Sequence, residues 1–180
     1  MLDESLDAVM LLNVEPDVDL LATDDAVAKL GKQNFVVALT PFVSNALLES
    51  ADLLLPVGTY AETSGTYVNV AGTWQSFAGV ANPVGEARPA WKVLRVLGNL
   101  IEAPGFDYVT SEDVRDELVE QLGEVTPDNT YAGTSRPNGA GKSSTDIDVP
   151  IYATDGLLRR AAALQLTPAA HRAAGKGNES

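Results

Sequence analysis

The sequence predicts an α/β fold: a small parallel sheet with flanking helices, a hairpin appendage and a flexible C-terminal linker. Two observations carry this prediction. Short apolar runs at residues 8–12, 35–39 and 53–55 alternate with helix-like segments. Strand-forming residues then flank a glycine turn near residue 72, which is typical of a β-hairpin.

The first strand is expected at residues 8–12, where Ala-Val-Met-Leu-Leu reads as a continuous apolar run typical of buried parallel strands. A helix is predicted over residues 19–32, with Leu20, Val27 and Leu30 on one face and Gly31 at its end. Because helices connect the apolar runs, the strands should be parallel with right-handed crossovers.

The second strand, at residues 35–39, is broken by Pro41, and Ser44 is a suitable N-cap for a short helix. The third strand, at residues 53–55, is stopped by Pro56. This half-sheet is Rossmann-like in shape. The loop after its first strand reads Asn-Val-Glu-Pro and lacks the glycine-rich dinucleotide fingerprint.

Strands at residues 66–70 and 73–77 should form the hairpin around Ala71-Gly72. Pro89 is well placed to begin a helix that runs to about Glu102. The apolar stripe of this helix comprises Trp91, Leu94, Leu97 or Gly98, and Ile101. Thr110 or Ser111 should cap a further helix, along which Val114, Leu118 and Leu122 repeat and which Gly123 closes.

The C-terminal part is expected to be organised differently. Residues 1–123 form the predicted α/β domain, and residues 124–148 are rich in turn formers, which predicts a flexible linker. A strand near residues 149–152 and a helix capped by Thr154 or Asp155 should make up a returning segment at 149–168. Residues 169–180 should form a frayed tail.

Composition excludes several function classes. The formal net charge of −13 argues against nucleic acid, whose phosphates require clustered Lys and Arg. The chain has no cysteine and one histidine, His171, so it cannot hold a Cys-ligated iron–sulfur cluster or build a zinc site alone. No apolar run approaches the roughly 18 residues of a membrane span, so direct membrane insertion is not expected.

The most informative run extends over residues 51–75. It contains Ala-Asp-Leu-Leu-Leu-Pro, then Glu62, then Gly-Thr-Tyr-Val-Asn, and later Gly72 and Gln75. This pattern resembles the strand–loop–hairpin segment of the molybdopterin oxidoreductase superfamily. Gln-Ser-Phe at residues 75–77 and Arg-Pro-Ala-Trp-Lys-Val-Leu at 88–94 are most similar to one branch, the large peripheral-arm subunit of bacterial NADH:quinone oxidoreductase, respiratory complex I.

The resemblance implies a structural and interaction role. The chain would be a C-terminal fragment of that subunit, on the cytoplasmic side of the inner membrane. It would support electron transfer from NADH to quinone through iron–sulfur clusters located outside this chain. Its partners would be other peripheral-arm subunits and the N-terminal part of its own parent subunit. The alternative is a molybdopterin-binding oxidoreductase domain, in which the loop after the first strand, often Gly-x-Asn-Pro, faces the pterin dinucleotide.

Candidate site residues lie on the signature hairpin. Glu62, Thr66, Asn69 and Gln75 could face a pterin, or they could satisfy the hydrogen bonds of a turn. The usual Glu-Gly-Arg of the superfamily is Ala-Gly-Thr at residues 71–73, which fits the relic of a cofactor site. We expect no catalytic residue, no metal ligand and no cofactor bound by this chain itself.

Other features have ordinary explanations beside functional ones. Gly139–Ser144 resembles the end of a phosphate loop, but Arg136 stands where that motif needs a glycine. Arg159 and Arg160 could pair with a partner's carboxylates or form a solvated helix face. Trp74 and Trp91 could be interface anchors or core residues. The acidic pairs at residues 24–25 and 112–113 suit helix N-termini.

Overall fold

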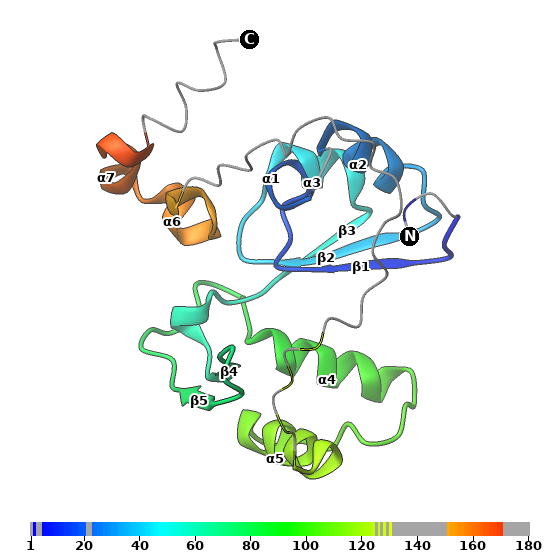
Figure 1. Cartoon of the computed structure of the whole chain (residues 1–180). Coiled ribbons are helices and arrows are strands. Elements are labelled where there is room, and N and C mark those ends of the chain that lie inside the picture. The colour runs from blue at the N-terminus through cyan, green and yellow to red at the C-terminus, as the bar shows by residue number, and fades with distance from the viewer. Residues whose placement is uncertain are drawn as a thin grey trace. The chain divides into compact units, whose positions relative to one another are not determined.

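The computed structural model describes residues 2, 5–20, 23–124, 126, 128, 130 and 151–170. The chain divides into two compact units, residues 1–127 and 128–180, and each is described by itself (Figure 1). Most of the predicted linker, the Gly139–Ser144 segment and His171 lie outside the described residues.

The first unit contains the predicted parallel sheet. Its strands are β1 (Val9–Leu12), β2 (Val36–Thr40) and β3 (Leu53–Pro56), in the order β1-β2-β3. Both pairs are parallel, with Val9 opposite Val36 and Val37 opposite Leu53. The sheet and its helices confirm the predicted α/β class, and the three strand positions agree within about one residue.

Three helices cover one face of this sheet: α1 (Pro16–Asp19), α2 (Thr23–Leu30) and α3 (Asn45–Ser50) (Figure 1). Leu30 of α2 and Leu47 of α3 are fully buried. They complete a core cluster with four strand residues, which are Val9, Leu11, Val36 and Ala38. Ser44 caps α3 as predicted, since its hydroxyl accepts the Leu47 N–H at 3.2 Å.

The helix predicted over residues 19–32 is present but shorter, since α2 spans Thr23–Leu30 and Asp19 ends the separate helix α1. Pro16 occupies the first turn of α1, where its missing N–H costs nothing. The Asp19 carboxylate accepts the Glu15 N–H at 2.8 Å. Leu20 then adopts an extended conformation (φ −103°, ψ 146°) and packs against the core cluster, which ends α1 after one turn.

Helix α4 (Ala90–Leu100) lies on the opposite face of the sheet (Figure 1). Ala90, Val93 and Leu94 pack against a second cluster formed by Val37, Leu39 and Val57. Ile101 does not belong to the buried stripe as predicted, because it ends the helix (φ −93°, ψ 10°) and is 76% exposed. A following helix, α5 (Ser111–Leu122), leaves Leu118 and Leu122 exposed as well.

The hairpin consists of β4 (Gly65–Val68) and β5 (Trp74–Phe77), which pair antiparallel. Its strands are shorter than predicted because Asn69 takes part in the turn. Tyr67 and Phe77 stack with ring centroids 5.1 Å apart. Trp74 is 37% exposed and is therefore not a core residue.

The second unit contains η2 (Ile151–Ala153), α6 (Gly156–Arg160) and α7 (Ala162–Gln165). Asp155 caps α6 as predicted, accepting the Leu157 N–H at 2.8 Å. The short strand expected to include Ile151 and Tyr152 is a 3₁₀ turn, and no described strand pairs with it. Among the described helices, none combines the length and apolar composition that crossing a membrane requires.

Candidate functional site

Glu62 stands at the centre of a small hydrogen-bond network beside the hairpin. It ends the 3₁₀ turn η1 (Tyr60–Glu62), and Oε2 accepts the Thr59 N–H at 2.8 Å and the Thr59 hydroxyl at 3.0 Å. Oε1 accepts the Val84 N–H at 3.1 Å. The Thr59 backbone hydrogen bond, helped by the other two, lowers the pKa of Glu62. The carboxylate therefore ties η1 to the loop that follows the hairpin.

Two further predicted residues make hydrogen bonds within the hairpin itself. Asn69 Oδ1 accepts the N–H groups of Ala71 at 3.0 Å and Thr73 at 2.9 Å, which closes the turn. The hydroxyls of Thr66 and Ser76 lie 3.0 Å apart across the two strands. Gln75 pairs with Tyr67 in the hairpin register and is exposed.

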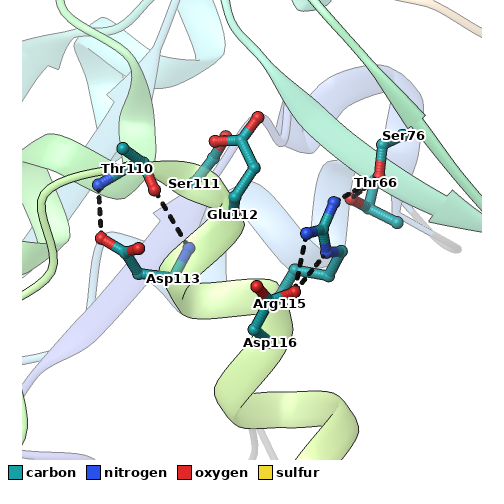
Figure 2. Close-up of polar contacts among 8 residues, drawn as sticks. All are labelled: Thr66, Ser76, Thr110, Ser111, Glu112, Asp113, Arg115 and Asp116. Carbon is teal, nitrogen blue, oxygen red and sulfur yellow. Dashed lines mark hydrogen bonds and ion pairs between the residues drawn. The ribbon is translucent and has the colours of Figure 1, made fainter.

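Arg115, which was not among the predicted site residues, connects the hairpin to α5. Its Nη1 donates to Ser76 Oγ at 3.0 Å, and its Nε donates to Asp116 Oδ1 at 2.7 Å. Figure 2 shows the guanidinium reaching from α5 toward Thr66 and Ser76. Arg115 and Ser76 are 39 positions apart, so no local pattern in the sequence could have indicated the contact.

A capping box fixes the N-terminus of α5 (Figure 2). Thr110 Oγ1 accepts the Asp113 N–H at 3.1 Å, and Asp113 Oδ2 accepts the Thr110 N–H at 2.8 Å and the Val109 N–H at 2.9 Å. The Thr110 backbone hydrogen bond is the main cause that lowers the pKa of Asp113. This geometry confirms the cap at Thr110, one of the two predicted residues, and it places the Asp113 carboxylate at a helix N-terminus, where negative charge is favourable.

A cavity of about 560 Å³ opens between the end of η1, the loop after the hairpin and the first turns of α4 and α5. The hydroxyls of Ser64 and Ser111 lie 2.7 Å apart within its lining and join two of these segments. The lining also includes Glu62, Asn82, Arg88, Trp91, Lys92 and Glu112. Of the predicted site residues, the cavity includes only Glu62, because the other three lie along the hairpin.

Trp91 and its neighbour Lys92 form the α4 side of this cavity. The Lys92 ammonium lies 5.3 Å from the centroid of the Trp91 ring. The indole Nε1 is buried and has no hydrogen-bond partner. Trp91 is half-buried, so it is neither a core residue nor a fully exposed anchor.

The remaining candidates make local contacts. Arg159 Nε donates to the Ala153 carbonyl at 2.7 Å, and Arg160 Nη1 donates to the Gly156 carbonyl at 3.0 Å. Within the part of the chain that the structure describes, no group of three or more His, Cys, Asp or Glu side chains could hold a metal ion.

Comparison with known proteins gives one clear result. A family model for molybdopterin oxidoreductases matches residues 1–100, which extend from the first strand through α4. No curated protein sequence matches the chain. Since the match covers more than half of its residues, this chain belongs to the molybdopterin oxidoreductase family.

Proposed function

We propose that this chain is a molybdopterin-binding domain of an oxidoreductase. The observation that carries the proposal is the family match over residues 1–100, which includes the whole parallel sheet and α4. In open α/β sheets, ligands bind beyond the carboxyl ends of the strands. The loops that follow β1, β2 and β3 therefore form the surface on which we place the cofactor.

The backbone after β1 fits this role. Asn13 adopts the left-handed conformation (φ 54°), which glycine enters readily and which asparagine tolerates better than most other residues. Asn13 stands where the resembled Gly-x-Asn-Pro loop has its glycine, so the substitution is compatible with the turn. The 13–16 loop, with the Thr40 end of β2, would hold the cofactor. When bound, molybdopterin supplies the metal centre at which a substrate is oxidised or reduced.

The hairpin fits the cofactor less well than the loop after β1 does. Glu62, Thr66 and Asn69 already use their side-chain oxygens in hydrogen bonds with neighbouring residues. A pterin would have to replace those bonds, and each lost bond would leave a backbone or hydroxyl group in need of a new partner. We therefore assign these side chains to holding the loops in place.

Co-purification tests this proposal. The chain should be produced in a host that makes molybdopterin, and oxidised pterin fluorescence and molybdenum should be measured per mole of folded protein. We expect pterin at a substantial fraction of the protein and a marked loss in Asn13→Val, because a β-branched residue opposes the left-handed turn. Circular dichroism checks that both proteins are folded. A folded wild-type chain that carries no pterin would contradict the proposal.

A second candidate is a structural role in the peripheral arm of NADH:quinone oxidoreductase. The hydrogen bonds made by Glu62, Thr66 and Asn69 favour it, since they give these residues a structural use. The similarity at residues 75–77 and 88–94 points to the same branch. In this case, the chain would contact other arm subunits on the cytoplasmic side of the membrane. Iron–sulfur clusters would be held elsewhere, because this sequence has no cysteine.

Native electrophoresis distinguishes the two candidates. A tagged chain with a peripheral-arm role should migrate with NADH dehydrogenase activity in extracts of its own cells. A pterin-binding domain outside that complex should migrate apart from the activity and carry pterin. Migration of the chain away from all NADH dehydrogenase activity would refute the second candidate.

A further inference from the structure

We infer that the cavity between η1, α4 and α5 binds a phosphate-bearing small molecule. This inference does not rest on the proposed function, because the cavity lies beside the hairpin and is not formed by the loop after β1. Its volume of about 560 Å³ lies within the range of small-molecule sites, which is roughly 300–1,000 Å³.

Two cationic side chains supply the charge. Arg88 and Lys92 both line the cavity, and neither forms an ion pair with any carboxylate among the described residues. One guanidinium nitrogen of Arg88 donates to the Ala87 carbonyl at 2.8 Å, and guanidinium has several further N–H donors. A guanidinium fork and a nearby ammonium are the usual protein partners of a phosphate group.

The backbone holds these cations in place. Arg88 forms a bridge with Val57, and its carbonyl accepts the Gly58 N–H at 3.0 Å. Lys92 lies in the first turn of α4, where its N–H donates to the Pro89 carbonyl at 2.9 Å. The backbone of both residues is therefore held by hydrogen bonds, which limits the backbone entropy lost when a ligand binds.

The N-terminus of one helix adds to the positive potential. Pro89 precedes α4 and provides no side-chain cap. Partial positive charge at a helix N-terminus stabilises an anion, and the first turn of α4 reaches the cavity. The N-terminus of α5 also lines the cavity but is already capped by Thr110 and the Asp113 carboxylate, so we assign the anion to the α4 side.

Two carboxylates also line the cavity and shape its selectivity. Both oxygens of Glu62 accept hydrogen bonds from Thr59 and Val84. Glu112 is exposed and accepts the Ser111 hydroxyl at 3.0 Å. Glu112 should repel an anion, so its removal should strengthen phosphate binding while removal of Lys92 should weaken it. The inference therefore requires that removal of Glu112 and removal of Lys92 change the Kd for phosphate in opposite directions.

Trp91 provides the readout. The chain has two tryptophans, so Trp74→Phe leaves Trp91 as the single tryptophan, and its fluorescence, excited selectively over tyrosine, reports on the cavity wall. Inorganic phosphate and phenyl phosphate should be titrated at constant ionic strength, with sodium chloride as the reference. We expect saturable fluorescence changes with both phosphates and tighter binding of phenyl phosphate, whose ring can contact the apolar wall.

In this background, Lys92→Gln should raise the Kd roughly tenfold, the effect of losing one close charge partner. Glu112→Gln should lower the Kd. Lys29→Gln is the matched control, because Lys29 pairs with Asp25 on α2 at 2.6 Å and does not line the cavity. If Lys92→Gln does not fold, Arg88→Gln and Glu112→Gln still give the two opposite shifts. A response equal to that of chloride, or a Kd unchanged in both charge variants, would overturn the inference.

Discussion

Replacing Glu62 should lower the stability of the first unit. Its carboxylate accepts three hydrogen bonds, from the Thr59 N–H at 2.8 Å, the Thr59 hydroxyl at 3.0 Å and the Val84 N–H at 3.1 Å. A hydrogen bond to a charged group contributes about 1.5–3 kcal/mol, and partial solvent access reduces that value because water competes for the same atoms. We therefore expect Glu62→Ala to lower the free energy of unfolding by about 2 kcal/mol, and Glu62→Gln by about 1 kcal/mol.

The effect should depend on pH with a definite sign. The fold lowers the pKa of Glu62 below its ordinary value of 4.5, chiefly through the Thr59 backbone hydrogen bond. The stabilisation is therefore fully present above pH 4.5 and is lost as the pH falls through the lowered pKa. The stability difference between wild type and Glu62→Gln should shrink over that acidic range.

Urea unfolding followed by circular dichroism measures both effects. The control is Glu120→Gln, which removes an exposed carboxylate from α5 and should change stability little. Two results would show that Glu62 does not hold the loops together. One is an unchanged midpoint in Glu62→Ala at neutral pH, and the other is a Glu62→Gln difference that persists undiminished at low pH.

Substitutions at three further positions test local features by urea unfolding. At Gly98, an added Cβ would clash with the Phe106 ring, so Gly98→Ala should cost about 1 kcal/mol after its gain in helix propensity is counted. In a Phe106→Ala background the same substitution should be stabilising. Asn13 has φ 54°, a conformation that glycine adopts readily and alanine does not. Asn13→Gly should therefore be nearly neutral, while Asn13→Ala should lower the free energy of unfolding by about 1 kcal/mol. Equal stability of the two variants would refute this reason. Thr110→Ala should cost about 1 kcal/mol by removing the acceptor of the Asp113 N–H, and Thr110→Ser should restore most of it.

Local sequence signals predicted much of the fold. The runs at residues 8–12, 35–39 and 53–55 became the three parallel strands because each was apolar throughout and bounded by a polar or proline break. Ser44, and Thr110 with Ser111 as its alternative, could be predicted as caps because capping depends on contacts within three residues. The family resemblance also came from one continuous segment, and the match over residues 1–100 agrees with it at the level of the superfamily.

The differences from prediction arise from tertiary packing, which a local pattern does not contain. Leu20 has the spacing of a helix face, but it is extended and packs against the core cluster before α2 begins. For Trp74 the sequence left a core position and an interface anchor open, and the two-stranded hairpin leaves part of this side chain in solvent. The cavity could not be predicted, because its lining joins segments that are distant in the sequence.

The signature segment and the cavity are physically linked, although the hairpin polar residues mostly bond to one another. The Ala61 carbonyl accepts the N–H groups of Val80 and Ala81 at 2.8 and 3.0 Å, and Glu62 holds Val84. An added Cβ at Gly79 would lie 3.1 Å from the Thr63 nitrogen, so a small residue is needed where these chain segments meet. These contacts hold the loop after the hairpin against η1, and together these segments form one wall of the cavity. Residues that carry a family signature thus shape the cavity through backbone placement, while the charges that we propose to contact a ligand come from Lys92 of α4 and from Arg88, two residues before that helix.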